Sequence, residues 1–334
     1  MTICKMDANE NPYSLPEPIK DEVTRKVSEF NFNRYPDSEA DFLKNKLAEY
    51  TGLQKNNIMV GNGSDELLSL VMKRFLGNNK KALISVPTFG MYSFYAENFG
   101  GGAVSISLKD DFSLDWSQIK VLAGREDIGL IVLCSPNNPT GNIIDFSQLE
   151  WLLSNSDKPI LLDETYWDFS RKTKIHLINE FSNLIITRTF SKSFSMAGLR
   201  LGYLAAGQSL VNKLEQIRSP YNTNSFSQKI ACLVLDSVEL FQKQWQSIRE
   251  NRNKLFAKLK DLKGVTPYPS LANFITFNTE KNEKEIYERL KAAGIKIRYF
   301  SNLSLCGDTL RVTVGKEKEN IMFIENLTKI VEEG

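Results

Sequence analysis

Residues 128–141 read IGLIVLCSPNNPTG, an apolar run followed at once by turn-forming residues. Short runs of this kind, without alternation of polar and apolar positions, are typical of strands buried on both faces of a mostly parallel sheet. The strand in this segment is expected at Leu130–Leu133. Five further runs of the same character lie on either side of it: Ile58–Val60, Ala82–Val86, Ile160–Leu162, Leu184–Thr187 and Leu201–Ala205.

Helical stretches separate these runs, as at Asp65–Leu76, where the apolar residues fall on one face. The alternation predicts an α/β fold, with a mostly parallel sheet flanked by helices. After a long helical stretch at 226–263, the pattern changes to that of a smaller α+β domain. There the expected strands are Asn273–Phe277, Ile295–Tyr299 and Thr309–Val314, and the expected helices are Glu283–Ala293 and Asn320–Val331.

Three parts are therefore expected along the chain. Residues 1–30 form an N-terminal segment near the functional site and the small domain, residues 31–240 a large ligand-binding domain, and residues 241–334 a small C-terminal domain.

Composition narrows the class of protein. The 334 residues carry 42 basic and 40 acidic side chains, a net charge of +2, which argues against nucleic acid or an anionic membrane as partner. No secretory signal or membrane-spanning run is evident, so a cytoplasmic protein is expected. Four scattered cysteines and one histidine, His176, make a metal site improbable.

Chemically distinctive residues follow five of the predicted strands. In open α/β sheets, ligands bind at the carboxyl ends of the strands, so these residues are expected to surround one site. They are Gly61–Glu66, Pro87–Phe89, Ser135–Gly141, Asp163–Tyr166 and Arg188–Lys192, with Arg200 eight residues further on.

Each of these residues suits a different chemical group, and one ligand could contain all of these groups. The helix that opens at Gly61–Glu66, with Gly63, Ser64 and Asp65, would hold a phosphate on its free N–H groups. Phe89 offers a face to an aromatic ring, and Asp163 needs a cation such as a protonated ring nitrogen. Lys192 could condense with an aldehyde. The remaining contributors are Thr189, Ser191 and Arg200 as further phosphate donors, and Asn138 and Tyr166 as donors to a phenolate oxygen.

Phosphate, aromatic ring, basic ring nitrogen, phenolate and aldehyde are the parts of pyridoxal phosphate. Two simpler interpretations stay open for single residues, since Asn138 could shape only the Pro-Thr-Gly turn and Phe89 could belong to the core. A dinucleotide site is not expected, because Glu66 stands where the fingerprint needs a third glycine.

Three stretches resemble the fold-type-I pyridoxal-phosphate-dependent aminotransferases in order and spacing. They are Asn137–Gly141, Asp163-Glu164-x-Tyr166, and Ser191-Lys192-x-Phe194-x-x-x-Gly198-Leu199-Arg200. Further stretches resemble the branch of that family that acts on histidinol phosphate: Asp7–Pro12, Arg34–Asp37, Gly61–Glu66, Pro87–Tyr92 and Leu310–Gly315.

The resemblance implies a role for each matching residue. Lys192 would form the Schiff base and carry protons, Asp163 would pair with the ring nitrogen, and Tyr166 and Asn138 would bond the ring oxygen. Arg298, Arg311 and Asn11 would bind substrate. Tyr35 would reach the cofactor phosphate of a neighbouring subunit, which implies a homodimer with a composite active site.

The implied reaction is amino transfer between L-histidinol phosphate, as amino donor, and 2-oxoglutarate, a 2-oxo acid, in histidine biosynthesis. Three alternatives remain open on the sequence. One is a pyridoxal-phosphate enzyme like threonine-phosphate decarboxylase, another is an aminotransferase for aromatic amino acids, and the third is a non-catalytic ligand-binding module.

Overall fold

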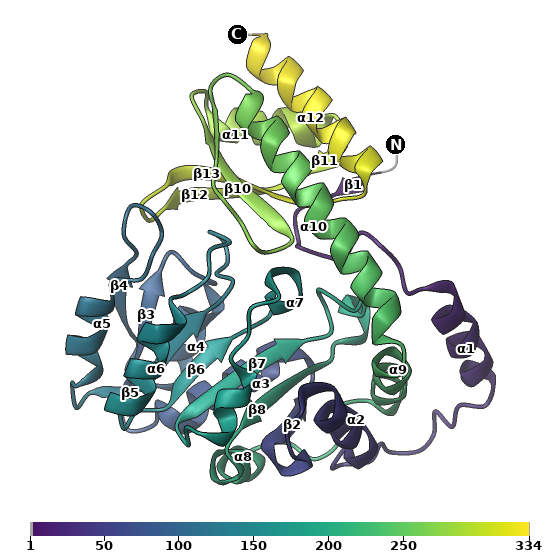
Figure 1. Ribbon diagram of the computed structural model, residues 1–334, viewed down its shortest axis with the longest axis vertical. Coiled ribbons are helices and arrows are strands. Elements are labelled where there is room, and N and C mark those ends of the chain that lie inside the picture. Colours follow the sequence, from purple (N-terminus) through teal and green to yellow (C-terminus); the bar gives the residue numbers. More distant parts are fainter. Residues whose placement is uncertain (1–2, 334) are drawn as a thin grey trace.

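The computed structural model describes residues 3–333 and contains two main sheets (Figure 1). The larger sheet has seven strands in the order β2-β8-β7-β6-β5-β3-β4. Their bounds are β2 Ile58–Gly61, β3 Lys81–Val86, β4 Ala103–Ser107, β5 Ile128–Cys134, β6 Ile160–Asp163, β7 Leu184–Thr189 and β8 Gly202–Ala206. The α/β class with a mostly parallel sheet is thereby confirmed.

Apolar side chains fill both faces of this sheet, because successive residues of a strand point to opposite sides. In β5, Ile131 and Leu133 pack on one face and Leu130 and Val132 on the other. The first face is covered by α5 Trp116–Ala123 and α6 Phe146–Asn155, and the second by α3 Gly63–Phe75, α4 Met91–Phe99 and α8 Gln208–Glu215.

Two features of the sheet differ from the sequence pattern. Strand β8 runs antiparallel to both of its neighbours, β7 and β2. Its start therefore lies at the same edge as the carboxyl ends of the parallel strands, which brings Arg200 to that edge. Strand β4 was not predicted, because its residues include Ser105 and Ser107 and it is a half-buried edge strand without an unbroken apolar run.

A four-stranded antiparallel sheet forms the smaller part of the molecule, in the order β12-β13-β10-β9. The elements are β9 Val265–Pro267, β10 Phe274–Thr279, β12 Arg298–Leu303 and β13 Gly307–Thr313, with α11 Glu283–Ala292 and α12 Glu317–Glu332. The predicted strand at 295–299 is two strands in the structure, β11 Ile295–Lys296 and β12, because Ile295 and Lys296 pair with the N-terminal segment instead.

Two helices occupy the predicted helical stretch at 226–263. Helix α9 covers Ser225–Leu235, and α10 covers Val238–Asp261 and runs from the large sheet to the small one (Figure 1). Its buried face, which includes Phe241, Trp245 and Leu255, belongs to one core that continues from the large domain into the small one.

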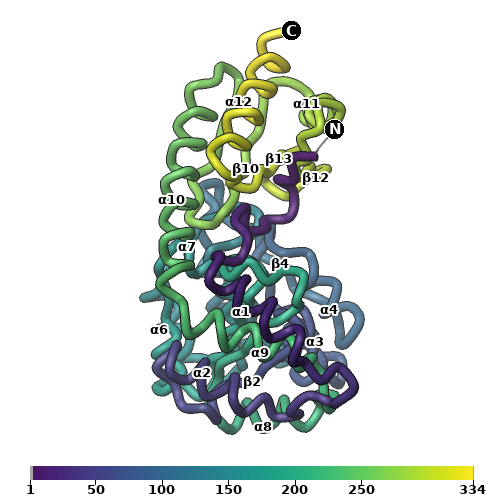
Figure 2. The backbone as a smooth tube through the Cα atoms, turned by 90° about the vertical axis from the view of Figure 1, so that its right-hand side faces the viewer, coloured from purple at the N-terminus to yellow at the C-terminus, as the bar shows by residue number. Residues whose placement is uncertain are grey.

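The N-terminal strap, defined here as residues 3–16, runs from the small sheet to the large domain (Figure 2). Strand β1, Cys4–Lys5, pairs in parallel with β11, and Met6 accepts a hydrogen bond from the Thr313 amide. Further along, the Ser14 carbonyl accepts from Gln244 of α10. Residues 1 and 2 of the expected N-terminal segment, and residue 334 of the small domain, lie outside the described residues.

The remaining elements connect these layers. They are α1 Glu17–Ser28, α2 Asp41–Thr51, α7 Trp167–Ser170 and the 3-10 helices η1 Lys55–Asn57, η2 Ile175–Asn179 and η3 Ala197–Leu199. Across residues 3–333, no helix is both long and apolar enough to cross a membrane.

A buried ion pair fixes the turn that follows β6. The Arg188 guanidinium donates to the Glu164 carboxylate at 2.7 and 3.0 Å, and both side chains are almost completely buried. Arg188 also lies over the Trp167 ring, 3.9 Å from its centroid. The pair therefore ties β7 to the segment that carries Asp163 and Tyr166.

Glu164→Gln should lower the free energy of unfolding by about 3–5 kcal/mol, because it leaves the Arg188 charge buried without a counter-ion. Urea denaturation of both proteins measures the difference. Glu150→Gln is the matched control, since Glu150 pairs with Lys174 in a more exposed setting and should change stability by less than about 1 kcal/mol. Equal effects of the two substitutions would contradict the prediction.

Candidate active site

A cavity of about 650 Å³ lies at the carboxyl ends of the parallel strands, where the two sheets face each other. Its wall is built from the large domain, from β12 and β13, and from the N-terminal strap. Twelve of the residues predicted from the sequence line it: Ser64, Asp65, Phe89, Asn138, Asp163, Tyr166, Thr189, Ser191, Lys192, Arg200, Arg298 and Arg311.

Asp163 ends strand β6 and is 3% exposed. One carboxylate oxygen accepts from the Tyr92 hydroxyl at 2.6 Å, and the other accepts from the Thr165 amide at 2.9 Å. Burial raises the pKa of Asp163, against the effect of these two donors. No basic side chain within residues 3–333 forms an ion pair with it, so a cation in the cavity, such as a pyridinium nitrogen, fits this carboxylate.

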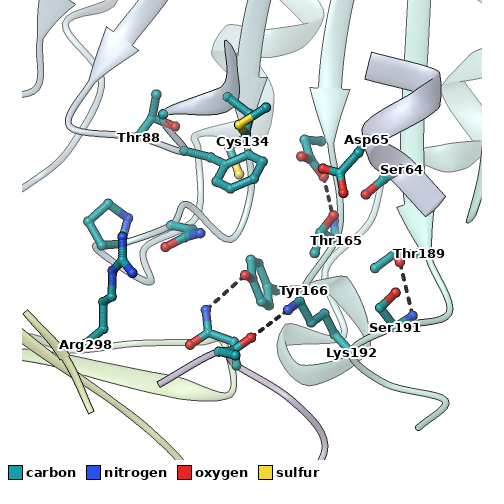
Figure 3. A pocket seen from close by; sticks show the side chains of 18 of the residues that line it. Ser64, Asp65, Thr88, Cys134, Thr165, Tyr166, Thr189, Ser191, Lys192 and Arg298 are labelled. Carbon is teal, nitrogen blue, oxygen red and sulfur yellow. Dashed lines mark hydrogen bonds between the residues drawn. The ribbon is translucent and has the colours of Figure 1, made fainter. Parts of the chain in front are cut away.

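Lys192 follows β7 and projects into the same cavity (Figure 3). Its amine donates to the Ala8 carbonyl of the N-terminal strap at 2.7 Å. The pKa of Lys192 is lowered to about 8, and burial is the largest cause. Of the two nearby arginines, Arg311 lowers this pKa more than Arg200 does.

Donors to a phosphate gather around the start of α3 (Figure 3). The first N–H groups of this helix have no partner within it, and they lie beside the Arg200 guanidinium. Arg200 donates to Ser191 Oγ at 3.3 Å and to the Asp65 carboxylate at 3.0 Å. This Arg200–Asp65 pair is about half exposed, so the guanidinium remains accessible to an anion from the cavity.

Gly63 does not line the cavity, but the arrangement requires a glycine there. Its φ is +78°, a left-handed conformation, and a Cβ on it would lie 2.7 Å from the Arg200 guanidinium. Any other residue would therefore strain the backbone and displace Arg200.

Asn138 and Arg311 act on each other. The Asn138 side-chain oxygen accepts from Arg311 at 2.5 Å, which leaves the amide nitrogen of Asn138 as the group free to donate. The Pro-Thr-Gly turn is held by the neighbouring residue rather than by Asn138, because the Asn137 side chain donates to Pro87 and Thr140 at 2.9 and 2.7 Å.

Arg311 and Arg298 face each other across two paired strands. They are directly opposed in the register of β12 and β13, so they lie on neighbouring strands. Arg311 is 6% exposed and also donates to the Asp7 carbonyl at 2.9 Å, while its Nε has no partner in the described chain. Burial lowers the pKa of Arg311 to about 10. The two guanidinium groups give this wall of the cavity two positive charges, which suit an anionic ligand.

Tyr35 and Asn11, two expected site residues, do not line the cavity. Tyr35 is 82% exposed and stacks on Tyr221, with ring centroids 4.7 Å apart. The Asn11 side chain donates to the Ser193 carbonyl at 3.0 Å and accepts from the Tyr13 amide, so in this structure it holds the segment next to Lys192 rather than facing a substrate.

Two side chains with direct contacts in the site were not predicted. Tyr92 lies within the stretch Pro87–Tyr92, yet nothing in its spacing shows that its hydroxyl reaches Asp163. Asn9 lies in the stretch Asp7–Pro12 and donates to the Tyr166 hydroxyl at 3.0 Å. Both contacts join residues far apart in the chain, so only the fold reveals them.

Phe89 is partly buried, lines the cavity and packs edge-on against Tyr92, with centroids 5.6 Å apart. The cavity therefore combines an aromatic face, a carboxylate without a counter-ion, an amine of lowered pKa and a phosphate site. These features define an enzyme that uses pyridoxal phosphate.

Comparison with known proteins agrees with this class. A family model described as aminotransferase class I and II matches residues 2–327, and the chain belongs to that family. It is a pyridoxal-phosphate-dependent aminotransferase of fold type I.

Individual relatives allow a narrower comparison than the family model. The chain is 38% identical to the histidinol-phosphate aminotransferase of Caldanaerobacter subterraneus subsp. tengcongensis over 327 residues, which are 98% of this chain and 93% of the relative. The fold matches the crystal structure of the histidinol-phosphate aminotransferase from Clostridium acetobutylicum with a TM-score of 0.92 and 24% identity, over 99% and 100% of the two chains. It matches the Sinorhizobium meliloti histidinol-phosphate aminotransferase in complex with pyridoxal-5'-phosphate with a TM-score of 0.91 and 22% identity, over 99% and 91%.

The lowered pKa of Lys192 predicts how cofactor loading depends on pH. The amine reacts only when unprotonated, so the rate at which the apoenzyme takes up pyridoxal phosphate should rise with pH and level off above a midpoint near pH 8. Stopped-flow absorbance measures this rate. Arg311→Met removes a neighbouring positive charge and should move the midpoint upward, whereas Lys192→Ala should abolish the absorbance of the covalent linkage. A midpoint near the ordinary lysine value in the wild type would contradict the prediction.

Proposed function

We propose that this aminotransferase moves the amino group between L-histidinol phosphate and 2-oxoglutarate in histidine biosynthesis. The observation that carries the proposal is the 38% identity, over 98% of the chain, to a histidinol-phosphate aminotransferase. The paired guanidinium groups of Arg298 and Arg311 support it, because both substrates are anionic.

The residues around the cavity divide the work of holding the cofactor. Arg200, Ser191, Thr189 and the N–H groups at the start of α3 would bind its phosphate, and Phe89 would cover its ring. Asp163 would pair with its ring nitrogen, while Asn138 and Tyr166 would donate to its ring oxygen. Bound there, pyridoxal phosphate supplies an aldehyde that condenses with amines and a ring that accepts electron density.

Lys192 would act twice in the reaction. As an unprotonated amine, the form that its lowered pKa favours, it would condense with the aldehyde of the cofactor and release water. Once displaced by the substrate amine, the same group is available to carry a proton from the α-carbon of the substrate. The Ala8 carbonyl supplies an acceptor for this amine at 2.7 Å, so the displaced lysine would stay at the cavity wall.

Arg311 would bind one anionic group of either substrate, and Arg298 would add a second positive charge to the same wall. Histidinol phosphate offers one phosphate and 2-oxoglutarate two carboxylates, and a guanidinium fork suits both kinds of group. Arg311 is already held by Asn138 and by the Asp7 carbonyl, so it would present its charge without further ordering.

Arg311→Ala should raise the KM for histidinol phosphate and for 2-oxoglutarate, each by about ten-fold or more, since a bond to a charged group contributes on the order of 1.5–3 kcal/mol. Steady-state kinetics with both substrates tests this. Arg125→Ala, which removes an exposed arginine paired with Asp127, should leave both KM values unchanged. A loss confined to one substrate would contradict a shared anion site. In a separate reaction with glutamate alone, release of carbon dioxide without amino transfer would instead favour a decarboxylase.

We further propose that the protein is a cytoplasmic homodimer in which each active site contains residues of both subunits. Tyr35 lies outside the cavity of its own chain and is exposed, on a surface that also shows Phe32, Phe42 and Tyr221. Such exposed aromatic side chains are typical of surfaces that bind another protein. Tyr35 would thereby reach the cofactor phosphate of the second subunit.

Mixed dimers test the composite site. Tyr35→Ala should weaken cofactor binding in the partner's site, whereas Lys192→Ala should inactivate its own site and keep Tyr35 intact. When the two variants are mixed and allowed to exchange subunits, each hybrid dimer holds one complete site, so activity should recover to about a quarter of the wild-type value at limiting cofactor. No recovery, in a sample shown by native mass spectrometry to contain hybrids, would contradict the role of Tyr35.

A further inference from the structure

Asn9 occupies a central place between the N-terminal strap, the small domain and the cavity wall. It is 1% exposed and has a φ of +54°, a left-handed conformation that non-glycine residues seldom adopt. Its backbone carbonyl accepts from Asn273, and its side chain lies between Thr313 of β13 and Tyr166. The site assigned above does not use this residue.

The hydrogen bonds around Asn9 fix which way its amide points. Its backbone N–H can only donate, and it donates to Thr313 Oγ1 at 2.9 Å. The Thr313 hydroxyl then has its own hydrogen to donate, and the Asn9 side-chain oxygen lies 3.3 Å away. A flipped amide would leave that hydrogen without an acceptor, so the amide nitrogen of Asn9 faces Tyr166.

This orientation determines the role of the Tyr166 hydroxyl. The Asn9 nitrogen donates to the Tyr166 oxygen at 3.0 Å, a bond that is dashed in Figure 3. Within residues 3–333, no acceptor receives the phenolic hydrogen in return. The ring cannot easily turn away, because it is buried and packs edge-on against Phe274 with centroids 5.2 Å apart.

We propose that Asn9 is a positioning residue: by donating to the Tyr166 oxygen, it directs the Tyr166 hydrogen into the cavity, toward the ring oxygen of bound pyridoxal phosphate. The inference rests on the placement of Tyr166 in the proposed function. The N-terminal strap would thereby keep the Tyr166 hydroxyl a hydrogen-bond donor to the cavity, because Thr313 orients Asn9 and Asn9 orients Tyr166.

The charged and titratable groups around Tyr166 are compatible with this role. Burial raises the pKa of Tyr166 to about 12, with smaller effects from Arg311 of β13, Asn9, Cys134 of β5 and Asp163 of β6. The hydroxyl therefore keeps its hydrogen at neutral pH. Arg311 and Asn9 both act on the oxygen and oppose the effect of burial.

The test is the pH midpoint at which the absorbance of the bound cofactor changes, which reports the proton shared between the ring oxygen and the Lys192 nitrogen. A donor to the ring oxygen lowers this midpoint, so Tyr166→Phe should raise it by about one pH unit or more. Asn9→Asp replaces the donor by an acceptor, which would draw the Tyr166 hydrogen away from the cavity, and should raise the midpoint by a similar amount. Asn9→Gly, which tolerates the left-handed backbone, should give a smaller rise.

A double variant separates hydrogen-bond direction from simple charge. In the Tyr166→Phe background, Asn9→Asp should shift the midpoint by much less than it does in the wild type. A wild-type midpoint in Asn9→Asp, or an equal shift in both backgrounds, would overturn the role of Asn9. The measurement uses no substrate, so a failure of histidinol phosphate to react would leave it unaffected and would count against the proposed function alone.

Discussion

A carboxylate buried without a counter-ion is the constraint around which this site is organised. Asp163 stands at the end of a strand whose other residues are entirely apolar, and its two oxygens are held by a tyrosine hydroxyl and a backbone amide. Neither donor supplies a positive charge. A cation in the cavity would balance the charge of this carboxylate at the apolar sheet edge, and in the proposed function the protonated ring of the cofactor is that cation. Lys192 and the proposed phosphate donors line the same cavity as Asp163, so one such ring would be within reach of all of them.

Much of the large domain was predictable, because residues buried on both faces of a parallel sheet leave unbroken apolar runs. The strand ends could then be collected into one site by topology alone, and Asp163, Lys192 and Arg200 do meet there. Strand β4 escaped the prediction because an edge strand with serines has no such run. The antiparallel direction of β8 was also not evident, since the apolar pattern of a strand does not depend on its direction.

Contacts between distant segments were beyond the sequence. The bond from Tyr92 to Asp163 and the bond from Asn9 to Tyr166 join side chains whose types are common and whose spacing along the chain is large. Lys192 donates to a main-chain carbonyl, and so does Arg311 in one of its two hydrogen bonds, and every residue has such a carbonyl. Side-chain identity therefore carries no signal for them, and only the path of the N-terminal strap determines where they lie.

Those two carbonyls belong to consecutive residues, Asp7 and Ala8, so one short stretch of backbone holds both an arginine and a lysine at the same wall. The two cations repel each other, and this repulsion helps to keep the lysine deprotonated. An anion bound to the arginine would offset this repulsion and raise the pKa of the lysine, which in the proposed function is the group that accepts a proton. By thermodynamic reciprocity, a protonated lysine must in turn strengthen the grip of the arginine on that anion.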